Sequence, residues 1–159
     1  MNWFDLHDLE NRLIESNVSD QEGFYYLLAN VILFGIGSYG TGDSYNYNIF
    51  MYADMAIALC ITIVGLNLTF KVNKKGDNQD YFKRFMALYF VIGIRLVLFL
   101  VLCITPAIIL GYFMLGGASS NKTVQDFVFL SLYTAVLIFF YYLLIQSFQR
   151  VAQHNPGVE

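Results

Sequence analysis

Two ionisable residues lie inside apolar runs of this sequence and are its best candidates for chemistry. Arg95 interrupts the run at 85–115, and Asp54 lies near the start of the run at 49–70. A charge at the bilayer centre is expensive, so such residues face a protein interior or water and are functional candidates. An arginine that lines an aqueous path repels cations and favours anions. Arg95 therefore predicts either a conducting interior or a site of assembly.

Several partners could compensate Arg95. At about 1.5 Å per residue, Arg95 lies roughly 17 Å above the basic end of its run and Asp54 roughly 23 Å above the corresponding end of its own. An arginine side chain can cover that difference, but each side chain leans toward its helix N-terminus, which moves these two apart. The alternatives are Asn30, a water-filled cavity, or a carboxylate or carbonyl of a neighbouring copy. Every alternative predicts that Arg95 faces away from lipid.

A stripe of small and polar residues accompanies Asp54 along its run. Its members follow one another by three or four residues, which places them on one helical face. Membrane helices approach one another through small and polar residues. We expect this face to form a helix–helix interface or to line a path. The stripe consists of Asp54, Ala58, Thr62, Gly65 and Thr69.

The composition is that of a membrane protein. Of the 159 residues, 57% are hydrophobic and 13% are charged, against about 25% charged in a typical soluble domain. The net charge of −3 argues against nucleic acid as a partner. The histidines, His7 and His154, lie in the terminal segments, and Cys60 and Cys103 lie in apolar runs, so we expect no metal and no cofactor.

The expected fold is all-α, with four transmembrane helices and an amphipathic helix before them. The third run is longer than one span needs and contains Pro106, whose missing N–H predicts a kink at Thr105 and Pro106. The spans are expected at 24–39, 49–70, 85–115 and 127–149, followed by a cytoplasmic tail at 151–159.

Residues 1–22 are expected to form an acidic amphipathic helix at the membrane interface. The apolar residues recur every three to four positions, and the other face is acidic. One interpretation is that the helix packs on its own protein, and another is that it docks a soluble partner together with the basic loop that follows the second run. The residues predicted to dock that partner are Trp3, Leu6, Asp8, Glu10, Lys74 and Lys75.

Basic residues predict the orientation. Five of the nine Lys and Arg residues flank the connection between the second and third runs. By the positive-inside rule this connection is cytoplasmic, which with four spans makes both termini cytoplasmic. The first residues lack the features of a cleaved signal peptide. We expect a multi-pass protein of the plasma membrane, of the bacterial inner-membrane type.

Three classes of function fit these features. The first is a homo-oligomeric channel-like or pore-forming protein, such as a membrane effector, in which a path forms between copies. The second is a non-conducting anchor or sensor subunit that recruits a soluble cytoplasmic protein. The third is an enzyme acting on a lipid or quinone through Cys60 and Cys103. No Ser–His, Cys–His or paired-carboxylate arrangement supports catalysis, so we expect no enzyme.

Overall fold

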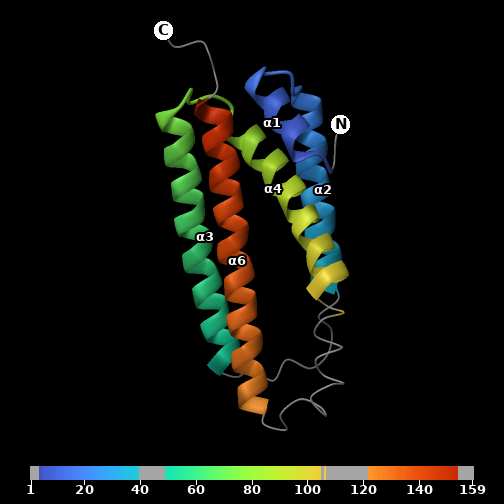
Figure 1. Ribbon diagram of the computed structural model, residues 1–159, viewed down its shortest axis with the longest axis vertical. Coiled ribbons are helices and arrows are strands. Elements are labelled where there is room, and N and C mark those ends of the chain that lie inside the picture. Colours follow the sequence, from blue (N-terminus) through green and yellow to red (C-terminus); the bar gives the residue numbers. More distant parts are fainter. Residues whose placement is uncertain (1–3, 40–48, 105, 107–121, 154–159) are drawn as a thin grey trace.

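The chain is helical throughout the part that the structure describes. The structure is a computed structural model that describes residues 4–39, 49–104, 106 and 122–153. Within these ranges there is no strand, which confirms the all-helical prediction. The elements are α1 (Leu6–Ile14), α2 (Asp20–Tyr39), α3 (Ile49–Lys75), α4 (Tyr81–Phe99), a π-helical turn η1 (Leu100–Ile104) and α6 (Lys122–Gln153) (Figure 1).

Three of these helices are long and apolar enough to cross a membrane. The segments are Tyr52–Lys75, Tyr81–Leu102 and Phe127–Gln153. Within their most apolar windows only 11%, 28% and 17% of the residues are buried in the protein, so most side chains face outward. Long apolar helices with outward-facing apolar side chains are compatible with a membrane protein, because lipid can cover the surface that the protein core does not.

Helix α2 differs from the other long helices. It begins at Asp20, four residues before the predicted span at 24–39, and carries Asp20 and Glu22 in its first turn. It is not among the three helices of spanning length and hydropathy found in the described residues. The fourth span therefore stays a prediction.

The N-terminal helix is shorter than the predicted 1–22. The Asp5 side chain caps it by accepting hydrogen bonds from the backbone N–H groups of His7 and Asp8. The helix ends at Ile14, and Ser16 then adopts a positive φ of 55°. This residue turns the chain into α2, so that two helices stand where the sequence predicted one.

The helices pack as two pairs joined at one end. Helix α3 lies along α6, and α2 lies along α4, while α4 also contacts α6 (Figure 1). Helix α1 lies across α4 and α6 at the end where α3 finishes and α4 begins. The core is concentrated at this end and includes Leu9, Leu13, Leu88, Leu144 and Phe148.

Glycine allows the close approach of α3 to α6. A Cβ built on Gly65 would lie closer than 3.0 Å to three ring carbons of Tyr141 on α6. A Cβ on Gly76, just after α3, would similarly overlap the backbone of Ala152. Small residues at a membrane helix interface let backbones come together in this way.

The third predicted span is described only in part. Helix α4 continues into η1, which ends two residues before Pro106. A π-helical turn changes the hydrogen-bond register, and such turns are a recognised cause of kinks. Thr105 and residues 107–121 lie outside the described residues, so the kink at Thr105 and Pro106 stays a prediction.

Candidate functional site

One face of α4 carries two arginines in opposite surroundings. Arg84, Leu88, Val91 and Arg95 follow one another by four, three and four residues, which places them on the same helical face. Arg84 is 2% exposed, and Leu88 and Val91 are fully buried. Arg95 is exposed. The face that is covered in the first half of α4 is therefore open at Arg95.

Arg84 is held by three hydrogen bonds from its guanidinium group. Its Nη1 donates to Asn73 Oδ1 at 3.1 Å, and its two Nη atoms donate to the two carboxylate oxygens of Asp77 at 2.5 Å each. Asn73 in turn donates to the carbonyl of Gln79 at 3.2 Å. This bidentate ion pair closes the turn between α3 and α4, so Arg84 has a structural partner on its own chain.

A second buried carboxylate fixes α1 to α6. Glu10 is 5% exposed, and its carboxylate accepts from Arg150 Nε at 2.9 Å and Nη2 at 2.6 Å. The hydroxyl of Ser147 also donates to Glu10, at 2.6 Å. Glu10 was predicted to dock a soluble partner, but these bonds use its carboxylate inside the chain. The docking role of Glu10 stays a prediction.

Two further ion pairs lie at the same end, one between α1 and α2 and one between α2 and α4. Arg12 Nη2 lies 2.6 Å from Glu22 Oε2, and Lys83 Nζ lies 2.7 Å from Asp20 Oδ1. The hydrogen bond from Arg12 lowers the pKa of Glu22, and the bond from Lys83 lowers the pKa of Asp20. Each carboxylate is therefore more stable in its charged form in the folded protein.

Arg95 and Asp54 lack such partners in the part of the chain that the structure describes. No hydrogen bond or ion pair joins Arg95 to a described residue. The Oδ1 atom of Asp54 is buried and has no hydrogen-bond partner. The two side chains were considered as a pair because sequential spans are usually neighbours, but α3 packs mainly on α6 and α4 mainly on α2. The structure does not bring them together within these residues.

Asn30 uses its amide elsewhere. Its Nδ2 donates to the carbonyl of Tyr26 at 2.9 Å and to the carbonyl of Met86 on α4 at 3.1 Å. The second bond ties α2 to α4, nine residues before Arg95. Asn30 therefore holds the helix pair together at this point.

The stripe on α3 faces α6. Gly65 and Thr69 are buried, and Asp54, Ala58 and Thr62 are partly buried. The Thr69 hydroxyl lies 3.0 Å from the Tyr81 hydroxyl and donates to the carbonyl of Leu66 at 2.9 Å. These contacts make the stripe a helix–helix interface at least near Gly65 and Thr69. Its role as a path lining stays a prediction.

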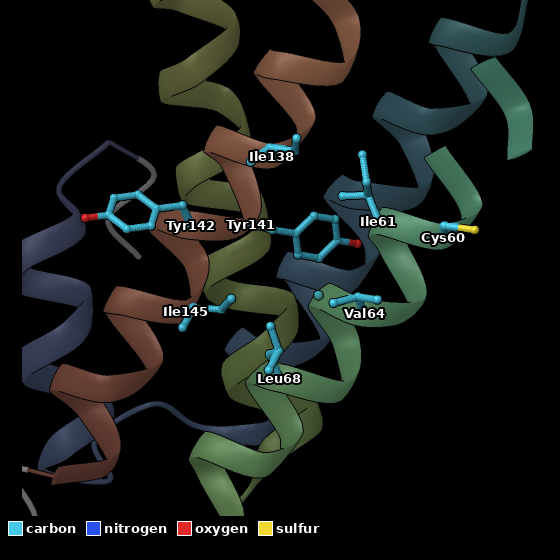
Figure 2. Close-up of a pocket in the computed structure, with 9 residues that line it drawn as sticks. Cys60, Ile61, Val64, Leu68, Ile138, Tyr141, Tyr142 and Ile145 are labelled. Atoms are coloured by element: carbon cyan, nitrogen blue, oxygen red, sulfur yellow. The ribbon is translucent and has the colours of Figure 1, made fainter. Parts of the chain in front are cut away.

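An apolar groove lies beside the same seam. It has a volume of 380 Å³ and lies between α3 and α6 (Figure 2). The Tyr141 ring extends from α6 toward α3 across it, while Tyr142 points away (Figure 2). Its lining residues are Cys60, Ile61, Val64, Gly65, Leu68, Ile138, Tyr141, Tyr142 and Ile145.

The remaining predicted docking residues are distributed around the same end. Leu6 and Asp8 are partly buried on α1, and Lys74 and Lys75 are exposed at the end of α3. Trp3 lies outside the described residues. Among the described residues, no group of three His, Cys, Asp or Glu side chains could hold a metal ion.

The fold and these clusters define an all-helical protein with three helices that can cross a membrane. Comparisons of the chain with protein families, with curated proteins and with solved structures found no match. What the protein does must therefore be argued from its own residues.

Proposed function

We propose that this protein is a homo-oligomeric, channel-like protein of the plasma membrane, with an anion-favouring path that Arg95 lines. The observation that carries the proposal is Arg95, which is exposed in the middle of a helix of spanning length and has no hydrogen-bond or ion-pair partner among the described residues. In a single chain this guanidinium would face lipid, which is costly. Water or a neighbouring copy removes that cost.

The path is proposed to form between copies. The groove between α3 and α6 is lined by apolar side chains and tyrosine rings, which do not favour an ion. The stripe on α3 is occupied by α6 near Gly65 and Thr69. An enclosure that contains Arg95 therefore needs surfaces from more than one chain, and its positive charge favours anions over cations.

The proposed orientation places the ion-paired end in the cytoplasm. Lys71, Lys74, Lys75, Lys83 and Arg84 lie around the turn between α3 and α4. The bond between Glu10 and Arg150 brings α1 and the end of α6 to this same end (Figure 1). The positive-inside rule then assigns both terminal helices to the cytoplasmic side.

Ion flux through purified protein in liposomes tests the proposal. Wild-type protein is expected to conduct chloride in preference to potassium, and Arg95→Gln is expected to abolish this preference. Arg95→Lys is the matched control, because it keeps the positive charge and should keep the preference. Absence of flux in the wild type, or equal selectivity in Arg95→Gln, would reject the channel.

A non-conducting anchor is the second candidate, and one observation favours it. Lys74 and Lys75 are exposed at the cytoplasmic end, and no hydrogen bond or ion pair joins them to the described residues. They could bind an acidic surface of a soluble protein. Capture of one cytoplasmic protein by the wild type, lost in Lys74→Ser/Lys75→Ser, would support this role.

A further inference from the structure

We propose that copies of this chain assemble through an intermolecular ion pair in which Arg95 of one copy binds Asp54 of a second copy. The inference rests on the proposed homo-oligomer and specifies its interface, and it competes with the proposed path, because an Arg95 guanidinium paired with a carboxylate no longer presents a free positive charge to an anion. In the three candidate spans, every other charged residue lies at the proposed cytoplasmic end: Lys71, Lys74, Lys75, Lys83, Arg84 and Arg150. Arg95 and Asp54 are the two charges left within the membrane, and they have opposite signs.

The two residues lie at matching depth. The contact between the hydroxyls of Thr69 and Tyr81, at 3.0 Å, gives α3 and α4 a common reference level. Asp54 precedes Thr69 by fifteen residues, and Arg95 follows Tyr81 by fourteen. At a rise of about 1.5 Å per residue, Asp54 lies about 22 Å from this level and Arg95 about 21 Å, measured along their helices.

Tilt and side-chain direction both increase the difference in depth between the two charges. Helix α4 is inclined to α3 and α6 (Figure 1), so the same number of residues covers less depth along α4 than along α3. Side chains also lean toward their helix N-termini, which separates the two charges further. The long arginine stem can cover such an offset, because it places its charge far from its own backbone.

The packing of one chain separates the two residues, which favours a second copy as the partner. Asp54 belongs to the α3–α6 pair and Arg95 to the α2–α4 pair. Arg95 lies on the face of α4 that is buried at Leu88 and Val91 but open further along the helix. Each copy thus presents one charge on each of two surfaces, which is the requirement for a self-complementary or head-to-tail contact.

The surroundings of both residues strengthen such a pair. Next to Asp54, Met55 is 64% exposed, and past Arg95, Val97 and Phe99 are 56% and 53% exposed. Apolar side chains around a charge pair exclude water and lower the local dielectric constant, which strengthens the attraction.

The test exchanges the two charges and measures the number of copies in the oligomer. The variants Arg95→Asp and Asp54→Arg are each expected to lose self-association, on the order of 100-fold, because like charges then meet at the interface. A mixture of the two single variants is expected to form mixed oligomers, since each variant then offers the charge that the other needs. Differently tagged chains and native mass spectrometry in detergent report copy number and composition.

The controls distinguish a variant that misfolds from one that folds but does not assemble. Wild-type helical content by circular dichroism confirms folding, and Arg95→Gln with Asp54→Asn provides a milder pair if a charge reversal does not insert. Single variants that keep the wild-type copy number, or a mixture of folded single variants that stays monomeric, would overturn the interface.

Flux measured on the same samples distinguishes the two proposals. Rescued assembly without flux would support the interface and reject the channel. Flux together with an unaltered copy number in all variants would support the channel and reject the interface.

Discussion

Arg84 and Arg95 are the same residue type on the same face of the same helix, yet the chain treats them differently. Arg84 is 2% exposed and makes a bidentate ion pair with Asp77. Arg95 is exposed and has no partner among the described residues. The fold of one chain accounts for Arg84 completely. Among the described residues nothing pairs with Arg95, and this difference is why we propose a role for it in assembly or in conduction.

The contrast extends to the two ends of the molecule. At the end that holds α1, three carboxylates bind arginine: Glu10, Glu22 and Asp77. Towards the other end, Leu102 and Phe129 are each 70% exposed, and the buried Asp54 Oδ1 atom has no hydrogen-bond partner among the described residues. Stability is therefore concentrated at the ion-paired end, and the apolar half depends on what surrounds it.

The largest effect is expected from breaking the buried pair. Arg84→Met leaves the buried Asp77 carboxylate without its cation, and such a loss costs about 3–5 kcal/mol. The free energy of unfolding, measured by denaturant titration in detergent micelles, should fall by that amount. Arg95→Met is the matched control, since it makes the same substitution on the same face of α4. Equal losses for the two variants would contradict the comparison.

A second large effect is expected at the contact between α3 and α6. Gly65→Ala forces a Cβ into the Tyr141 ring, and overpacking of this kind costs about 1–3 kcal/mol. Gly93→Ala is the control, because its Cβ would lie 3.8 Å from Phe140, which is an ordinary contact. The same unfolding titration should show a loss of stability in Gly65→Ala and little change in Gly93→Ala. A loss confined to Gly93→Ala would contradict the close contact between α3 and α6.

A smaller effect is expected from releasing α1. Glu10→Gln removes the charge that holds Arg150 and the acceptor of the Ser147 hydroxyl. The cost should be about 1–2 kcal/mol, because the Arg150 side chain is half-exposed and can regain water. Hydrogen exchange measured by mass spectrometry should rise across Leu6–Ile14 and stay unchanged in α3. Unchanged protection of α1 would show that apolar packing alone holds it.

The pair of Arg12 and Glu22 should give a weak pH dependence. Because the folded pKa of Glu22 is lowered from its ordinary value of 4.5, the pair contributes stability above that pH and loses it as the pH falls through the folded pKa. The contribution should be about 0.2–1 kcal/mol, since both side chains are partly solvated. Thermal unfolding between pH 7 and pH 3 should show a smaller acid-induced loss in Glu22→Gln than in the wild type.

The sequence predicted where the helices lie better than it predicted which helices contact one another. Long apolar runs identify membrane helices, because a helix satisfies its backbone hydrogen bonds in lipid within a single segment. The stripe of small residues also located the face of α3 that meets another helix, as Gly65 and Thr69 show. It did not identify α6 as the partner. Apolar side chains surround most of each helix, so periodicity carries little information about which helices meet.

The ion pairs at the end that holds α1 show a second limit of prediction from the sequence. Arg84 was interpreted as part of a topology signal, although Asp77 precedes it by seven residues across a short turn. Glu10 and Arg150 are separated by 140 positions, and no local pattern joins them. Charges near a membrane boundary can both set the orientation of the helices and form ion pairs between them. Their spacing in the sequence predicts the orientation but does not predict which charges pair.

The smallest effect is expected at Arg95 itself when stability is measured on a single chain. Arg95→Gln removes no described hydrogen bond or ion pair, so the free energy of unfolding of the detergent-isolated monomer should change by less than about 0.5 kcal/mol, as for other exposed sites. Copy number should fall in the same variant under conditions in which the wild type assembles. A loss of several kcal/mol in the monomer would mean that Arg95 is a structural residue like Arg84, and the difference between the two arginines would then disappear.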